Sequence, residues 1–186
     1  MRWRAAAFLC VAFWFCGCHK TDNAFDKAMS FREKMLSSNG CSFSTTVTAD
    51  YGEQIYTFSM DCVCDKEGNL TFSVTKPESI AGITGKVLSE GGSLTFDDKI
   101  LAFQTIADGQ ITPVTAPWLF MKTIRSGYLN GCSIQEDGVE ITIDDSYRED
   151  SLRLLVSVKN DLPSSAEIFW KGRRVMSLIV ENFAYL

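Results

Sequence analysis

The sequence predicts a mainly β protein of the α+β class, with a curled antiparallel sheet or unclosed β-barrel of about ten strands. Over most of the chain after residue 41, apolar and polar side chains alternate with a period of two, and turn pairs such as Asp137-Gly138 separate the alternating runs. Two segments with helical spacing interrupt this pattern, one near the N-terminus and one near the middle. Since a sheet this wide must curl, we expect both helices on its concave face.

The first helix is predicted to begin at Asp22, which suits an N-cap, and to end at Gly40, which suits a left-handed C-cap. Its apolar face is expected to consist of Phe25, Ala28, Met29, Met35 and Leu36. The second helix is predicted from Pro117 to a cap at Gly127, with basic residues near its C-terminal end. Its apolar residues are Trp118, Leu119, Met121 and Ile124.

The alternating runs between and after these helices predict the strands. We expect strands at 42–49, 53–64, 70–76, 94–96, 100–104, 132–135, 139–144, 152–158, 166–171 and 175–185. The glycine-rich segment 78–93 is expected to form a loop with a short strand.

Composition fits one globular domain and excludes several classes of function. The chain has 186 residues, of which 46% are hydrophobic and 22% charged, the balance of a folded domain. It has a formal net charge of −5 and no block of Lys or Arg, which disfavours nucleic-acid binding. His19 is the one histidine, so His-based triads, multi-His metal sites and His proton relays are excluded from the folded body.

The N-terminus has the pattern of a signal peptide. Arg2 and Arg4 precede an uncharged apolar run over 5–15, which is too short to span a bilayer but fits the apolar core of an export signal. The run ends at Gly17 and Cys18. The alternatives are a plain secretory signal with incidental cysteines and a retained membrane anchor.

No internal repeat or interdomain linker is visible in the rest of the chain. We therefore divide the chain into a signal peptide at 1–17, a short tether at 18–21 and a single domain at 22–186.

The end of the leader resembles the lipobox of bacterial lipoproteins, with Phe15 where Leu is usual and Cys16 where Ala or Ser is usual. The resemblance implies cleavage after Gly17 and attachment of lipid, with palmitate-type acyl chains, to the Cys18 thiol. Such a lipid would hold the domain on the outer face of the cell membrane.

The order of elements in the domain resembles the lipoprotein-sorting carriers, the LolA/LolB-like fold, and related Gram-positive lipoproteins, including one of spore germination. The stretches that carry the resemblance are 72–77, a strand that ends in proline, and 94–100, the hairpin that follows. The resemblance implies an unclosed antiparallel barrel, capped by helices, whose apolar interior accepts acyl chains. A curled-sheet domain without a cavity is the alternative.

Four cysteines remain in the predicted domain: Cys41, Cys62, Cys64 and Cys132. Disulfides are expected in an exported protein. If Asp50 faces Glu53 in the first hairpin, Cys41 lies opposite Cys62, and Cys64 is left to join Cys132. A register shifted by two pairs Cys41 with Cys64 instead. Free buried thiols are a further alternative, as is a redox or metal pair at 62–64, although four zinc ligands at the usual spacing are absent from the sequence.

Paired acids are the strongest catalytic candidates, and they lack the necessary geometry. Asp97-Asp98, Asp144-Asp145 and Glu149-Asp150 lie at predicted turns or strand ends, and adjacent residues of a strand point to opposite faces. We therefore expect no catalytic residue, no metal, no cofactor and no enzymatic activity.

Aromatic residues provide the remaining functional signal. Phe58, Phe72, Phe96, Phe103, Trp118, Phe120 and Trp170 lie within or beside the apolar alternation. These side chains are expected either to pack a solid core or to line an apolar pocket between the sheet and the second helix.

Together these patterns predict a membrane-anchored, extracytoplasmic lipoprotein that binds an apolar or acylated ligand, or a protein that presents one, and shields it from water. The alternative is a protein-interaction module of the cell envelope or spore with a solid core, which docks its partner on an edge strand or on the segment 78–93.

Overall fold

The structure is a computed structural model that describes residues 20–89, 91–107, 110–148 and 151–186. The expected signal peptide, the lipid attachment site at Cys18 and the acid pair Glu149-Asp150 lie outside the described residues.

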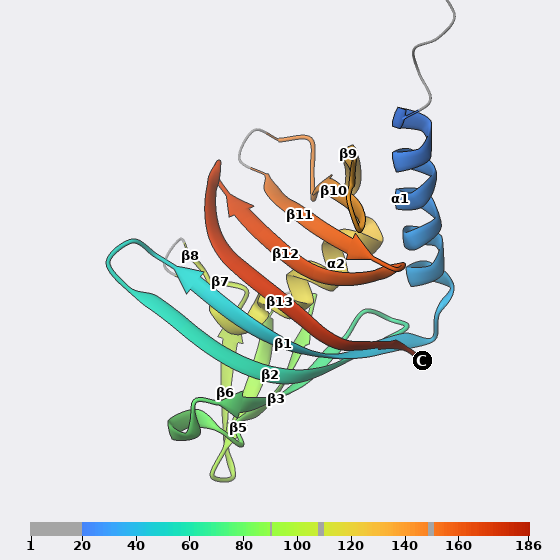
Figure 1. The fold of residues 1–186 in the computed structure, drawn as a ribbon. Coiled ribbons are helices and arrows are strands. Elements are labelled where there is room, and N and C mark those ends of the chain that lie inside the picture. The colour runs from blue at the N-terminus through green and yellow to red at the C-terminus, as the bar shows by residue number, and fades with distance from the viewer. Residues whose placement is uncertain (1–19, 90, 108–109, 149–150) are drawn as a thin grey trace, which may run out of the picture.

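An antiparallel sheet of eleven strands curls around helix α2 (Ala116–Ser126) and remains unclosed (Figure 1). The strand order is β6-β5-β4-β3-β2-β1-β13-β12-β11-β10-β9. The predicted fold class is therefore confirmed. The strands of the first half are β1 (Gly40–Asp50), β2 (Ile55–Asp65), β3 (Leu70–Lys76), β4 (Thr84–Leu88), β5 (Gly91–Phe96) and β6 (Lys99–Gln104). Those of the second half are β9 (Tyr128–Gln135), β10 (Gly138–Asp144), β11 (Leu152–Lys159), β12 (Leu162–Trp170) and β13 (Arg173–Tyr185).

The sheet consists of two meanders, β1 to β6 and β9 to β13, which join where β1 pairs with β13. Between the meanders the chain crosses from the β6 edge to the β9 edge under the concave face. The crossing consists of the small hairpin β7 (Ile106–Ala107) and β8 (Gln110–Ile111), the 3-10 helix η2 (Pro113–Thr115) and α2. This path explains why α2 is buried nearly all round, since sheet surrounds it. Its buried residues are Ala116, Pro117, Trp118, Leu119, Phe120, Met121, Thr123 and Ile124.

Helix α1 (Lys20–Ser37) packs against β9, β10 and α2, and it begins two residues before the predicted N-cap at Asp22. Its predicted apolar face is partly wrong. Ala28 and Met35 are buried as expected, but Phe25, Met29 and Leu36 are 50%, 43% and 50% exposed. The buried face consists of Ala24, Ala28, Phe31 and Met35. The small alanines let the helix backbone lie close to the sheet, which selects this face over the neighbouring one.

The glycine-rich segment 78–93 contributes more strand than expected. It forms a short 3-10 helix, η1 (Glu78–Ile80), then β4 and the start of β5. A Cβ at Gly85 would lie 2.5 Å from Phe72 Cζ, and one at Gly92 would lie 2.6 Å from Phe103 Cζ. The two glycines therefore make room for aromatic rings from the neighbouring strands.

The first hairpin has the alternative register. Cys41 lies opposite Cys64, and Phe43 lies opposite Cys62, so the predicted opposition of Cys41 and Cys62 is wrong. The reason is the turn, in which the Tyr51 N–H donates to the Gln54 carbonyl at 3.0 Å, so that four residues rather than two connect the strands.

The expected disulfides are likewise not formed. The four cysteines of the domain, all within the described residues, carry free thiols. Cys132 lies on β9 opposite Ile141, whereas Cys64 faces Cys41, so Cys64 and Cys132 are not cross-strand neighbours.

One end of the concave face, which we call the closed end, is densely packed around Cys41, Phe43, Phe120 and Met121. The Phe43 and Phe120 ring centroids are 5.9 Å apart in an edge-to-face arrangement, and Cys41 Sγ lies 3.8 Å from Met121 Sδ. The nearby Thr45 hydroxyl donates to the Ile179 carbonyl at 2.9 Å. The interior here is a filled core with its polar atoms paired.

Candidate functional site

Elsewhere on the concave face a hollow of about 410 Å³ lies between α2, the end of β6 and the β11–β12 side of the sheet. Its volume lies in the range of small-molecule pockets. Because Trp118 and Trp170 both line it, we call it the tryptophan cleft. A larger hollow of about 740 Å³ lies beside Tyr51 and Tyr56, but its lining is mainly polar.

The base of the cleft is apolar and rigid. Trp118 is 3% exposed, and its Nε1 donates to the Gly68 carbonyl at 3.1 Å, which fixes the ring on the turn between β2 and β3. Leu119, Ile111 and Leu152 complete the apolar surface, and all three are buried. An apolar group that enters the cleft therefore meets a surface that is already in place.

Two polar atoms in the cleft residues are not satisfied. Thr105 Oγ1 and Trp170 Nε1 are buried, and neither has a hydrogen-bond partner in the described part of the chain. A buried donor without a partner costs about 1–3 kcal/mol. The two indoles of the cleft thus differ, because that of Trp118 has an acceptor and that of Trp170 has none.

Charged side chains lie at the opening of the cleft. The Lys122 ammonium sits over the Trp118 ring at 4.9 Å from its centroid, and the Lys171 ammonium lies 5.8 Å from the centroid of Trp170. Lys122 and Asp145 both line the cleft and are exposed. The opening is therefore polar and solvated, whereas the base is apolar.

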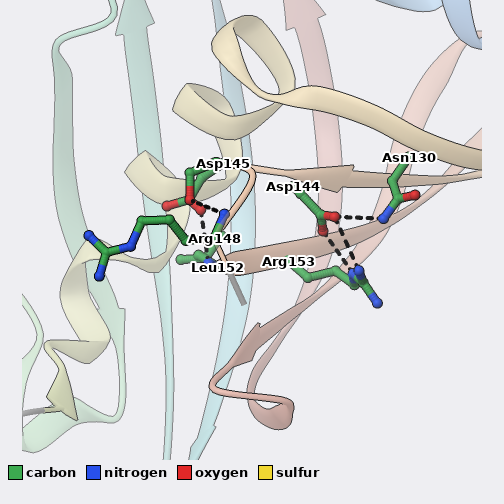
Figure 2. A network of polar contacts seen from close by, with 7 residues as sticks. Asn130, Asp144, Asp145, Arg148, Leu152 and Arg153 are labelled. Carbon is green, nitrogen blue, oxygen red and sulfur yellow. Dashed lines mark hydrogen bonds and ion pairs between the residues drawn. The ribbon is translucent and has the colours of Figure 1, made fainter. Parts of the chain in front are cut away.

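The acid pair at 144–145 divides between the two faces of the sheet. Figure 2 shows Asp144 between Asn130 and Arg153, with Nδ2 of Asn130 at 2.6 Å and Nε of Arg153 at 2.7 Å. Asp145 turns away and accepts from the Leu152 N–H at 2.9 Å. The hydrogen bond from Arg153, aided by that from Asn130, lowers the pKa of Asp144 against the opposing effect of partial burial. The two carboxylates therefore do not face a common cleft.

The thiols of Cys41 and Cys64 belong to directly opposed residues of β1 and β2 at the closed end, where Cys41 Sγ contacts Met121 Sδ and Cys64 Sγ contacts the Asp65 carbonyl. The interaction between the two thiols, together with burial, raises the pKa of Cys41, while the same interaction lowers the pKa of Cys64 against the opposing effect of burial. Burial also raises the pKa of Cys62. Among the described residues, no group of three or more His, Cys, Asp or Glu side chains is placed to hold a metal ion.

The structure brings two of the predicted pocket residues, Trp118 and Trp170, to the cleft. Phe58, Phe72 and Phe120 are buried in the core. Phe103 packs against the core from β6, and Phe96 is 47% exposed on β5.

Sequence reasoning missed the polar and aliphatic members of the cleft. Thr105 follows β6 with the same parity as the inward-facing Phe103, and this signal identifies it as a residue of the concave side. Lys122 lies one helical turn after Trp118 and on the same side of α2. Nothing in the sequence places Asp145 or Leu152 beside these residues, because they come from the other meander.

The fold defines the class of the protein: an unclosed antiparallel half-barrel with an internal helix. None of the helices in the described ranges is long and apolar enough to cross a membrane. No family model matches the chain, and no curated protein matches its sequence.

Solved structures to which this chain is similar include bacterial lipoproteins and a LolA superfamily protein. A DUF1329 family protein from Desulfovibrio piger is 10% identical, with 90% of this chain and 94% of that chain covered and a TM-score of 0.49. A LolA superfamily protein from Nitrosomonas europaea is 12% identical, with coverages of 84% and 92% and a TM-score of 0.43. A chain from the complex of the CwlD amidase with the GerS lipoprotein of Clostridioides difficile is 14% identical, with coverages of 92% and 99% and a TM-score of 0.40.

Proposed function

We propose that the protein is a non-enzymatic lipoprotein of the cell envelope that binds one apolar or acylated group in the tryptophan cleft. The observation that carries the proposal is the apolar base of Trp118, Leu119 and Leu152, which faces an open hollow while the closed end is packed solid. Burying an acyl chain there would gain about 25 cal/mol per Å² of apolar surface removed from water.

The anchor is part of the same proposal. Lipid on Cys18 would tie the chain to the outer face of the cytoplasmic membrane immediately before α1, which begins at Lys20. With several acyl chains at that point, attachment would be firm. The cleft would then sample ligands close to a bilayer surface.

Fluorescence quenching tests the binding site directly. Apart from Trp3 and Trp14 in the leader, the chain has only Trp118 and Trp170, and both line the cleft. We expect palmitate brominated near its chain end to quench the tryptophan fluorescence of the full chain in a saturable manner. The matched control is the double variant Trp118→Phe, Trp170→Phe, in which the saturable part should disappear. Quenching that never saturates, or that persists in the double variant, contradicts the proposal.

A second candidate function is protein docking on the edge strand β6. Ile100 and Leu101 on this strand are 76% and 65% exposed, and β6 is an end strand of the sheet, so one row of its backbone groups is open to strand addition. In this case extended apolar peptides should bind the full chain, and Leu101→Lys should abolish that binding without changing the quenching by brominated palmitate. Peptide binding that survives Leu101→Lys contradicts this candidate.

A further inference from the structure

A second hollow, of about 740 Å³, lies where the β1–β2 turn meets the segment that leads from β8 into η2. Figure 1 shows the β1–β2 hairpin beside β7 and β8. We call this the tyrosine hollow, because Tyr51 and Tyr56 line it. Its lining is mainly polar, whereas the base of the tryptophan cleft is apolar, and Ile111 borders both. The two hollows therefore suit different chemical classes of ligand.

The fold holds the two tyrosine rings in place. The Tyr51 hydroxyl donates to the Ile111 carbonyl, and the Tyr51 backbone N–H donates to the Gln54 carbonyl at 3.0 Å. The Tyr56 hydroxyl donates to Oε1 of Gln54, and the centroids of the two rings lie 6.2 Å apart at an interplanar angle of 62°. Tyr56 is nevertheless 46% exposed. A ligand would thus meet an aromatic surface that is already ordered, which lowers the entropic cost of binding.

The tyrosine hollow carries little charge. Of the residues that line it, all of them described, Glu53 alone has a charged side chain. The guanidinium of Arg173 lies near the turn but pairs with Asp50 at 3.1 Å. Burial raises the pKa of Tyr51 to about 12, so its phenol stays protonated at neutral pH. A phosphate or carboxylate ligand would therefore find no cationic partner in the lining and would be repelled by Glu53.

The polar side chains of the lining offer both acceptors and donors. A glutamate carboxylate only accepts, whereas a glutamine amide donates through its nitrogen and accepts through its oxygen. Because Oε1 of Gln54 already accepts from Tyr56, the Nε2 of Gln54 is left to donate. Glu53 and Gln110 are exposed, and within the described chain neither side chain has a hydrogen-bond partner. A ligand that uses this set must itself donate and accept at neighbouring positions.

A neutral sugar meets these requirements. Each hydroxyl of a sugar both donates and accepts, as a serine hydroxyl does. One face of a pyranose ring carries C–H groups with a positive partial charge, which are attracted to the negative face of an aromatic ring. An alkylammonium ion would also be attracted to the rings and to Glu53, but it would leave the amide donor of Gln54 unused.

We propose that the tyrosine hollow is a carbohydrate-binding site that takes one unit of a neutral glycan. The sugar ring stacks on Tyr56, the more exposed of the two tyrosines. Glu53 accepts hydrogen bonds from the sugar hydroxyls, and Nε2 of Gln54 donates to them. This inference goes beyond the proposed function and does not depend on ligand binding in the tryptophan cleft.

Isothermal titration calorimetry of the full chain with chitotetraose, cellotetraose and mannotetraose tests the site. We expect saturable binding of at least one of these neutral glycans. Tyr56→Ala should weaken the binding by about tenfold, because the stacking surface is lost, whereas Tyr56→Phe should retain most of the affinity. Glu53→Gln should weaken it several-fold, because an amide oxygen is a poorer hydrogen-bond acceptor than a carboxylate.

The matched control is Tyr128→Ala, because Tyr128 lies on β9 and is 44% exposed, close to the value for Tyr56. It should leave the affinity for the glycan unchanged. Urea denaturation of every variant separates loss of the site from loss of the fold. Glu53→Gln, a change of charge at an exposed position, keeps the test decisive if Tyr56→Ala does not fold.

Three results would overturn the inference. The first is no saturable binding of any of the three glycans at millimolar concentration. The second is a loss of affinity with Tyr128→Ala as large as that with Tyr56→Ala. The third is binding of tetramethylammonium that requires Tyr56 and Glu53 while no glycan binds, which would assign the hollow to organic cations.

Discussion

Two regions of the concave face, the closed end and the tryptophan cleft, contain the same residue types and differ in whether their buried polar atoms are hydrogen-bonded. At the closed end, aromatic rings pack edge to face, and the Thr45 hydroxyl has a backbone acceptor at 2.9 Å. At the tryptophan cleft, aromatic rings border a hollow, and within the described chain the Thr105 hydroxyl has no partner. Aromatic residues on an alternating strand therefore indicate only that a position faces inward. The two regions differ in whether the polar atoms beside these rings have hydrogen-bond partners.

The largest effect should come from opening a cavity at the closed end. Phe120 is fully buried, so Phe120→Ala should lower the free energy of unfolding by about 3–5 kcal/mol, from lost burial and the cavity left behind. Urea denaturation followed by circular dichroism measures it. The matched control is Phe96→Ala, since Phe96 is 47% exposed, and it should cost less than about 1.5 kcal/mol. If the two variants lose similar amounts of unfolding free energy, Phe120 does not lie in a more tightly packed environment than Phe96.

The thiol pair offers a way to strengthen the closed end. With oxidised glutathione as the oxidant, Cys41 and Cys64 should lose two protons and two electrons and form one disulfide, because they lie directly opposite each other on β1 and β2. The bridge should stabilise the fold by about 3 kcal/mol, measured by urea denaturation with and without reductant. Of the four cysteines in the domain, alkylation of the denatured, unreduced protein should label only Cys62 and Cys132. Labelling of all four domain cysteines, or a bridge that contains Cys62, contradicts the prediction.

The smallest effect concerns the sheet beside the cleft, where Asp144 links β9 and β11 through Asn130 and Arg153 (Figure 2). Because the folded-state pKa of Asp144 lies below its ordinary value, its contribution is fully present above about pH 4 and is lost as the pH falls through the folded-state pKa. Asp144→Asn should therefore lower the unfolding free energy by up to about 1 kcal/mol at pH 7.

Urea denaturation across pH 2 to 7 should show the difference between wild type and Asp144→Asn shrinking below about pH 4. Asp137→Asn serves as the control, because the side chain of Asp137 is 75% exposed in its pair with Lys159 and its removal should change little. A difference between wild type and Asp144→Asn that is constant with pH would mean that the carboxylate charge does not stabilise this part of the sheet.

Local patterns predicted the sheet and α2, because alternation and helical spacing reflect contacts within a strand or a turn. These patterns gave a wrong prediction where the local sequence fits two arrangements equally well. In α1, Phe25 and Met29 are as apolar as Ala24 and Phe31, and the packing of the helix against β9, β10 and α2 decides which face is buried. In the first hairpin, the register depended on whether two or four residues form the turn at Tyr51.

The tryptophan cleft was predicted only in part for a related reason. Trp118 and Trp170 could be identified by their size and apolar sequence context. Whether the Thr105 hydroxyl and the Trp170 indole have hydrogen-bond partners depends on how the ends of β6 and β12 are arranged around α2. That arrangement involves both meanders and the crossing between them, so it is a property of the assembled sheet. No spacing within one segment encodes it.

The pairing of β1 with β13 has a consequence for how the molecule assembles. These two strands come from nearly opposite ends of the described chain. The sheet cannot enclose α2 until β1 and β13 have paired. Contacts of such high sequence separation make folding slow, because the loop-closure entropy must be overcome before the long-range contacts form. A partly synthesised chain that lacks residues 173–185 should therefore remain loose until the last strand is present to pair with β1.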